Sequence, residues 1–417
     1  MIEPSVQAVD TVYDRAHSWS GDDRPVIVVG ITHSQTSLVL FGRLSALRRA
    51  GFRVVLISSP GRLLERIADA EGIEPIAVPI SRGIAPLADF VSLVRLWRIL
   101  GHLKPFATEF STPKAGLLGS LAAKFRGVPV RIYILRGLRL ETMKGLKRVV
   151  SLAAERIAAA CSHHVVCNSE SLREKARLLR VATGSKFHLL GSGSSRGVDV
   201  EHFSPGPDVV KARLGIPSHV PVIGFVGRLT RDKGVPELIQ AFEDILFAIP
   251  SARLLFVGWF DDSEDAVDAD VRATISNHPH IIHTGFVEDT APYYKAMDIL
   301  ILPTWREGFP NVVLEAAATG IPVITTLSTG SRDAVVPEVT GLLIPAGYPK
   351  AISEAAIQLL RNPDRRYRMG RAARAWVLEH FANERVLALT VSFYRKLLSE
   401  AFEDGPVLPR DVPAAAD

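Results

Sequence analysis

Cysteine is scarce in this chain of 417 residues, which contains only Cys161 and Cys167. Two thiols exclude a disulfide scaffold and a multi-cysteine zinc module, and they fit a reducing cytoplasm. No long run of residues stays apolar, so we expect no transmembrane helix, and the first residues show no secretion signal. Hydrophobic residues make up 47% and charged residues 22%, which excludes a chain that is disordered throughout.

Two familiar glycine motifs are also missing. There is no GxxxxGK[ST] phosphate loop, and Gly191, Gly193 and Gly197 do not form the GxGxxG turn of a dinucleotide site. This argues against a nicotinamide oxidoreductase. We expect Asp261, Asp262, Asp268 and Asp270 to be solvated in a polar loop, and His163-His164 has no further candidate metal ligands nearby.

Charge is distributed unevenly along the chain. Residues 1–205 carry 28 Lys and Arg against 17 Asp and Glu, whereas the remainder carries 21 against 27. A basic half joined to an acidic half favours two domains with different partners. The basic half could face nucleic acid, an anionic membrane or a diphosphate.

The hydrophobic pattern alternates between short apolar runs and helical periodicity, and it starts anew after Gly206-Pro207. Such alternation predicts parallel sheets that are covered on both faces. We therefore predict an α/β chain with two doubly wound, Rossmann-like domains facing each other across a cleft. The expected segments are a flexible arm (1–24), two domains (25–205 and 206–385), a helix returning to the first domain (386–404) and a disordered tail (405–417).

The expected elements follow from this pattern. The strands are Pro25–Val29, Phe52–Ile57, Ile76–Val78, Pro105–Thr108, Val130–Ile134, His164–Cys167, Val220–Val226, Ala252–Val257, Ile281–Thr284, Ile299–Leu302 and Pro322–Thr325. The helices are Leu38–Arg49, Leu63–Ala70, 87–102, 114–126, 142–160, 170–182, Pro236–Ala248, 312–319, 350–361 and 370–403.

The strongest chemical signal is the segment 303–315, which follows a buried strand. Asn311 is expected to cap a helix that begins near Val312, and the N–H groups of that helix would favour an anion such as a diphosphate. Glu307 precedes the helix and Glu315 lies one turn into it. Carboxylates at such a place can accept hydrogen bonds from sugar hydroxyls. An ordinary helix with an acidic N-terminus would have the same sequence pattern.

A second signal, Gly224–Gly234, again lies between a strand and a helix. Arg228 and Lys233 flank a turn that contains Gly227. A guanidinium fork and an ammonium group together suit a pair of phosphates. A solvated basic turn is the alternative.

Together, these two motifs resemble the donor domain of the retaining glycosyltransferases of family 4, which have the GT-B fold. The resemblance rests on E-x7-E from Glu307 to Glu315 and on G-R-L-x-x-x-K-G from Gly227 to Gly234. It implies that Arg228 and Lys233 bind the diphosphate of a UDP-sugar and that Glu315 holds the ribose. Glu307, with the backbone of Gly308, Phe309, Pro310, Asn311 and Val312, would contact the sugar.

The same resemblance implies that Phe286 and Val287 lie where the base is held, and that no cofactor or metal is needed. The expected catalytic residues are Glu307, Arg228 and Lys233. The leaving diphosphate is expected to assist deprotonation of the acceptor hydroxyl, so no dedicated base is sought.

Three segments of the first half are similar to bacterial members that act on undecaprenyl-diphosphate-linked sugars. They are Ser111–Gly119, Leu135–Thr142 and Gly191–Asp199. The implied partners are a nucleotide sugar, a polyprenyl-diphosphate-linked saccharide and the inner face of the cytoplasmic membrane, with no nucleic acid and no protein partner. The candidate acceptor-side or lipid-side residues are Thr32, His33, Lys114, Arg136, Lys144, Lys147, Arg148, Gly193 and Ser194.

Two helices are candidates for the membrane contact. Residues 87–104 form an amphipathic basic pattern, and within 141–156 Lys144, Lys147 and Arg148 share one helical face. Ordinary core-facing or solvated helices remain alternatives. Alternatives for the whole chain are a UDP-N-acetylglucosamine 2-epimerase-like enzyme of the same fold and a non-enzymatic basic binding protein.

Overall fold

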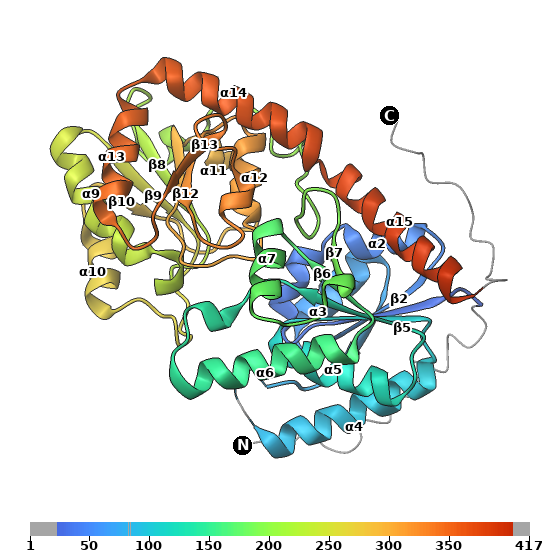
Figure 1. Ribbon diagram of the computed structural model, residues 1–417. Helices are drawn as coiled ribbons and strands as arrows, with labels where there is room; N and C mark the ends of the chain where they lie inside the picture. Colours follow the sequence, from blue (N-terminus) through green and yellow to red (C-terminus); the bar gives the residue numbers. More distant parts are fainter. Residues whose placement is uncertain (1–22, 82, 84, 403–417) are drawn as a thin grey trace.

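The computed structural model describes residues 23–81, 83 and 85–402 (Figure 1). They form two α/β domains, each built on a parallel sheet. The predicted tail, 405–417, lies outside the described residues, and so does the predicted arm, 1–24, except for its last two residues.

The first sheet has the strand order β3-β2-β1-β4-β5-β6-β7, and its paired strands are parallel. All five residues of its interior strand β1 are buried, as expected for a strand covered on both faces. Its strands are β1 (Val26–Gly30), β2 (Arg53–Ser58), β3 (Glu74–Ala77), β4 (Ala107–Ser111), β5 (Val130–Leu135), β6 (His164–Cys167) and β7 (Phe187–Leu189). The helices are η1 (Ser34–Leu40), α2 (Arg43–Arg49), α3 (Arg62–Glu71), α4 (Pro86–Leu103), α5 (Pro113–Phe125), η2 (Arg139–Glu141), α6 (Gly145–Cys161), α7 (Glu170–Leu178) and η3 (Gly184–Lys186).

The second sheet has the order β10-β9-β8-β11-β12-β13, again with parallel pairs. Its strands are β8 (Val222–Val226), β9 (Arg253–Val257), β10 (Ile281–His283), β11 (Ile299–Leu302), β12 (Val323–Thr326) and β13 (Gly341–Ile344). The helices are α8 (Val210–Arg213), η4 (Arg231–Lys233), α9 (Val235–Ala248), α10 (Ala269–Asn277), α11 (Ala291–Tyr294), α12 (Asn311–Ala318), η5 (Arg332–Ala334), α13 (Pro349–Leu360) and α14 (Pro363–His380).

In both sheets the strand order reverses next to the first strand, between β1 and β4 and between β8 and β11. Ligands of doubly wound sheets bind outside the carboxyl ends of the strands at such a switch point. The first domain touches the second beside the second switch point: a Cβ atom on Gly308, in the loop after β11, would lie 1.7 Å from the carbonyl oxygen of Arg136, which follows β5.

The last helix, α15 (Asn383–Ala401), runs back over the first domain (Figure 1). Val391, Leu397 and Leu398 join the core formed by β1, β2 and α2. The Tyr394 hydroxyl donates to the buried carboxylate of Glu109, which also accepts two 2.5 Å bonds from Arg43. The predicted two-domain architecture with a returning C-terminal helix is therefore confirmed.

Several predicted elements differ in detail. The helix expected over Leu38–Arg49 is broken at Gly42, which has a φ of 81°, so a 3-10 turn precedes α2. The helical stretch expected from 370 is two helices, because Phe381 leaves the helix and accepts a backbone bond from Val198 in the interdomain linker. Strands β7 and β13 were not predicted. Both are short edge strands, whose apolar runs are too brief to give a clear period.

A buried carboxyl group, Glu155 of α6, makes the stability of the first domain depend on pH. It accepts a 2.5 Å bond from the Tyr133 hydroxyl, and burial raises its pKa from 4.5 to about 7. The folded chain therefore holds this proton more tightly than the unfolded chain, so stability falls as the pH rises between these values and changes no further above them.

We predict that Glu155→Gln, which stays neutral, gains stability relative to the wild type as the pH rises from 5 to 8, by up to ~3 kcal/mol. Thermal unfolding of both proteins across this range measures the difference. Glu354→Gln on the surface is the control, since the Glu354 side chain is 68% exposed. An unchanged difference between Glu155→Gln and wild type across this range would show that Glu155 ionises normally.

Candidate functional site

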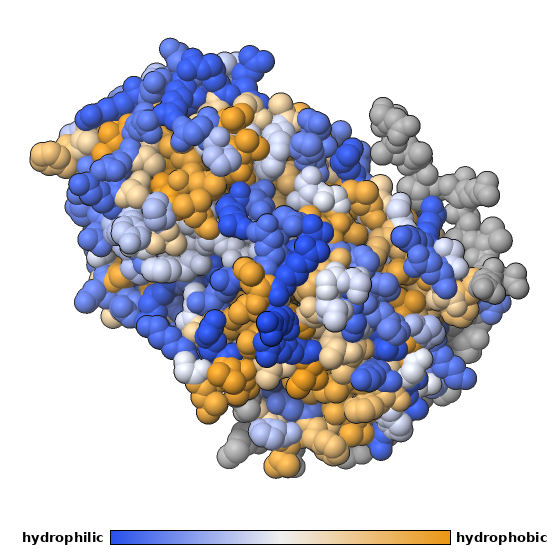
Figure 2. All heavy atoms as spheres, in the orientation of Figure 1, coloured by the Kyte–Doolittle hydropathy of each residue, from blue (hydrophilic) through white to orange (hydrophobic). Residues whose placement is uncertain are grey.

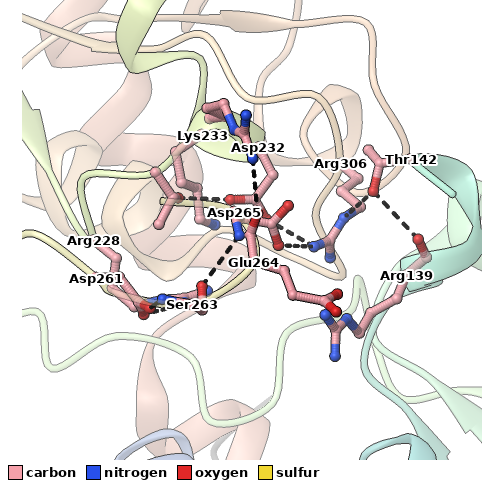
Figure 3. A network of polar contacts seen from close by, with 12 residues as sticks. Arg139, Thr142, Arg228, Asp232, Lys233, Asp261, Ser263, Glu264, Asp265 and Arg306 are labelled. Carbon is pink, nitrogen blue, oxygen red and sulfur yellow. Dashed lines mark hydrogen bonds and ion pairs between the residues drawn. The ribbon is translucent and has the colours of Figure 1, made fainter. Parts of the chain in front are cut away.

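Two loops at the carboxyl ends of β8 and β11 are clamped together by ion pairs. Lys233 binds the Glu307 carboxylate. Next to this pair, the Arg306 guanidinium lies 2.8 Å from Asp232 (Figure 3). Two adjacent residues of the first loop, Asp232 and Lys233, thus form ion pairs with two adjacent residues of the second loop. The approach also depends on Gly234, which has a φ of 74° and whose Cβ would lie 2.1 Å from the Pro303 carbonyl oxygen.

The ionised form of Asp232 is stabilised by its neighbours in the clamp. Burial opposes its ionisation, but the hydrogen bond from Thr230 (2.6 Å) and the charge of Arg306 hold its pKa below the usual range. Asp232 and Arg306 were not among the predicted site residues. Asp232 precedes Lys233 and Arg306 precedes Glu307, so their positions inside the two motifs could have indicated them.

Arg228 does not join the clamp and instead binds Asp261 at 2.6 Å (Figure 3). The prediction that Asp261 is solvated is wrong: its side chain is 13% exposed. Burial opposes its ionisation, but bonds from Arg228 and Ser263 lower its pKa. Asp262, Asp268 and Asp270 are exposed, as predicted. Asp261 comes from the loop after β9, so only the fold brings it to Arg228.

Helix α12 begins at Asn311, and Pro310 occupies the cap position. The prediction that Asn311 caps the helix is therefore wrong. Its side-chain oxygen instead accepts a bond from Ser194 of the first domain at 3.2 Å. Phe309 and Pro310 are buried, and Phe309 packs against Phe381. The start of α12 thus faces the segment 193–197.

Glu315 lies one turn inside α12 and is buried. The Tyr294 hydroxyl donates to it at 2.8 Å, and Arg196 lies 3.6 Å away. Burial raises the pKa of Glu315. Tyr294 and Arg196 were missed as site residues: Arg196 lies within the glycine-rich segment 191–199, whereas nothing in the sequence marks Tyr294.

The loops after β8, β9 and β10 meet at three glycines. Gly258 donates its N–H to the Gly285 carbonyl oxygen, and a Cβ on Gly258 would lie 1.8 Å from the Gly227 carbonyl oxygen. This close contact brings Phe286, which is 60% exposed, to the same edge of the sheet as Arg228. The Phe286 ring packs edge-on against Trp259, whereas Val287 packs against the core.

Several predicted acceptor-side residues make contacts inside the first domain. The Thr32 hydroxyl accepts from the Ala115 N–H at the start of α5, and the His33 ring accepts from the Gln35 N–H. Lys114 binds Asp89 at 2.7 Å. Gly193 has a φ of 107°, and a Cβ there would lie 2.3 Å from the Asn168 carbonyl oxygen. These contacts give the residues a structural role within the first domain. Their contact with the acceptor stays a prediction.

The remaining basic candidates lie at the domain boundary. Arg136 follows β5 and donates to Ser195 at 2.8 Å, while burial and the nearby Arg43 lower its pKa to about 10. Lys144, Lys147 and Arg148 are exposed at the start of α6. Lys147 reaches across to Glu264 of the second domain at 3.4 Å.

A pocket of about 520 Å³ opens between the domains beside the clamp. Its lining residues are Arg139, Thr142, Met143, Lys144, Lys147, Glu264, Asp265 and Arg306. Arg306 is shared with the clamp, whereas Arg228, Lys233 and Glu307 do not line the pocket. Among the residues that the structure describes, no group of three His, Cys, Asp or Glu side chains is placed to hold a metal ion.

Both domains match known protein families. Residues 43–193 match the family described as glycosyl transferase 4-like domain, and residues 220–362 match glycosyl transferases group 1. The capsular polysaccharide biosynthesis glycosyltransferase CapM of Staphylococcus aureus is 34% identical over 89% of this chain and 97% of its own length. An Escherichia coli UDP-Gal:alpha-D-GlcNAc-diphosphoundecaprenol alpha-1,3-galactosyltransferase is 26% identical over 70% of this chain and 75% of its own.

Solved structures share the fold at lower identity. Sucrose-phosphate synthase from Thermosynechococcus elongatus has a TM-score of 0.76 at 21% identity, covering 90% of this chain and all of its own. Anabaena Alr3699/HepE in complex with UDP-glucose has a TM-score of 0.74 at 16% identity, covering 89% of this chain and 99% of its own. With the family matches on both domains and with its similarity to CapM, the chain belongs to the group 1 glycosyltransferases and is a glycosyltransferase of the two-domain GT-B fold.

Proposed function

We propose that this enzyme moves a hexose or N-acetylhexosamine from a UDP-sugar to a polyprenyl-diphosphate-linked glycan, with retention of the anomeric configuration, in cell-surface polysaccharide synthesis. The observation that carries the donor half of the proposal is the clamp. It holds Lys233 and Glu307 together at the switch point of the second sheet, beside Arg228 and ahead of α12.

The acceptor half rests on the relatives. The E. coli relative is named for a diphosphoundecaprenol acceptor and a UDP-galactose donor, and the S. aureus relative for capsular polysaccharide biosynthesis. HepE, which shares the fold, was solved with UDP-glucose. These names support a UDP-sugar donor and a lipid-linked acceptor for this chain.

The proposed chemistry uses charges that are already in place. Lys233 and Arg228 are held by Glu307 and Asp261, so a donor diphosphate would exchange one anionic partner for another. Their positive charges would then stabilise the diphosphate as it leaves. Glu307 would turn to a sugar hydroxyl, and Glu315, held by Tyr294, would face the ribose. No metal is required in this scheme, because the cations and the start of α12 supply the positive potential.

The proposed contact with the membrane is through the first domain. Helices α4 and α6 both pack against α5, so the two candidate segments belong to one layer, seen along the lower side of Figure 1. Both expose large apolar side chains, and Figure 2 shows hydrophobic surface along this side of the molecule. They are Leu87, Phe90, Val91 and Trp97 on α4, and Leu146, Val149, Val150 and Ile157 on α6. In the part of the chain that the structure describes, no helix is long and apolar enough to cross a bilayer.

The substrate proposal is tested by measuring UDP release from a panel of UDP-sugars, with and without undecaprenyl-diphosphate-linked sugars. We expect release only when both substrates are present, and NMR of the product should show the anomeric configuration of the donor. Release without an acceptor would favour hydrolysis or the epimerase chemistry of the alternative function. Inversion would contradict the retaining mechanism.

The clamp predicts the effect of single substitutions. Lys233→Ala and Glu307→Ala should each lower kcat/KM by about 100-fold or more, because each removes a group aimed at the reacting end of the donor. Lys350→Ala is the matched control: Lys350 is 85% exposed and pairs with Glu354 on its own helix. Near-normal kcat/KM in the folded Lys233→Ala protein would refute the assigned role.

The membrane contact predicts binding to anionic vesicles that weakens with added salt. Leu146→Ser combined with Val149→Ser should reduce co-sedimentation with phosphatidylglycerol vesicles several-fold, because both side chains would enter the interface. Phe247→Ser is the control, since Phe247 is 92% exposed on the second domain. Equal binding by both variants would contradict a contact through α6.

A further inference from the structure

The pocket between the domains has a cationic wall that the donor site does not use. Arg139, Lys144 and Lys147 come from η2 and the start of α6, and they face Glu264, Asp265 and Arg306 of the second domain. Figure 3 shows Arg139 and Thr142 on one side and Glu264, Asp265 and Arg306 on the other. The pocket therefore belongs to both domains.

The four cations of the pocket differ in their pairing. Arg306 is matched by Asp232 and by Asp265, and Lys147 lies 3.4 Å from Glu264. The Arg139 and Lys144 side chains have no hydrogen bond or ion pair with any residue in the described part of the chain. No acidic residue lies in the first turn of α6, which starts beside them. The N-terminal wall is thus suited to a dianion.

The residues around the pocket indicate which kind of anion fits it. Arg306 bridges the pocket to the clamp: its Nε donates to Thr142 at 3.0 Å, and the next residue is Glu307. A ligand in the pocket would therefore lie beside the proposed donor sugar, and Glu264 and Asp265 offer acceptors for hydroxyl groups. On the other side, Leu146, Val149 and Val150 are exposed along the first turns of α6, a path for an apolar chain that leaves the pocket.

We propose that this pocket binds the diphosphate of the polyprenyl-linked acceptor. Arg139 and Lys144 hold the phosphates, the prenyl chain leaves along the exposed face of α6, and the acceptor sugar points to the Arg306 side. This inference rests on the proposed function for its choice of ligand. The weak contact between Lys147 and Glu264, each 74% exposed, gives way when the diphosphate binds.

A direct binding experiment tests the pocket independently of turnover. Farnesyl diphosphate, a short soluble probe, is titrated into the full chain by calorimetry, with and without saturating UDP. We expect binding in both cases, weaker binding of inorganic diphosphate and none of farnesol. Arg139→Gln combined with Lys144→Gln should weaken farnesyl diphosphate at least about tenfold and leave the affinity for UDP within twofold, whereas Lys144→Arg should retain binding. Lys124→Gln, an exposed α5 position outside the pocket, is the control.

The outcomes separate this inference from the proposed function. If UDP displaces the probe, or the double variant loses both ligands equally, the pocket serves the donor and the inference is wrong. If the wild type transfers sugar to lipid-linked acceptors but the double variant keeps its acceptor KM, the diphosphate binds elsewhere. If the probe binds here while lipid-linked acceptors are not glycosylated, the pocket assignment stands and the proposed acceptor fails.

Discussion

The pairing of Asp232 with Arg306 and of Lys233 with Glu307 is the interaction on which the site depends. It joins the loop after β8 to the loop after β11 at the point where the strand order reverses. Neutralising these charges inside the crevice lets two basic and two acidic groups lie close together without the cost of unpaired buried ions. The clamp therefore fixes where Glu307, Arg306 and the start of α12 lie, and Arg306 also lines the interdomain pocket.

A second constraint is the close approach of backbone at the domain boundary. Gly308 of the second domain faces the Arg136 carbonyl of the first at a distance that a Cβ would not allow. Equally close approaches within each domain, of Gly193 to the Asn168 carbonyl and of Gly330 to the Gly308 carbonyl, shape the loops on either side. The linker and the chain before α15 are also joined, because Val198 exchanges backbone bonds with Phe381 and Asn383. The domains thus meet through backbone, while their charged side chains remain along the crevice and the pocket.

The local distribution of charge in the folded chain differs from the net charge of each half of the sequence. The second half of the chain is acidic overall, yet it contains Arg228, Lys233 and Arg306 at one sheet edge, each beside a carboxylate. The excess positive charge of the first half is exposed in part at the start of α6, where Lys144, Lys147 and Arg148 flank apolar side chains. Local pairing rather than net charge decides what each surface can bind.

The sequence alone determined the alternating elements, the two domains and the two motifs, because buried parallel strands and helix starts depend on local apolar runs and on turn residues. Only the tertiary structure decided which charges meet. Asp261 reaches Arg228 from the loop after β9, Tyr294 reaches Glu315 from α11, and Tyr394 reaches Glu109 from 285 residues away in the sequence. Such contacts join residues far apart in sequence, so no local pattern records them, and the pocket exists only where the two domains meet.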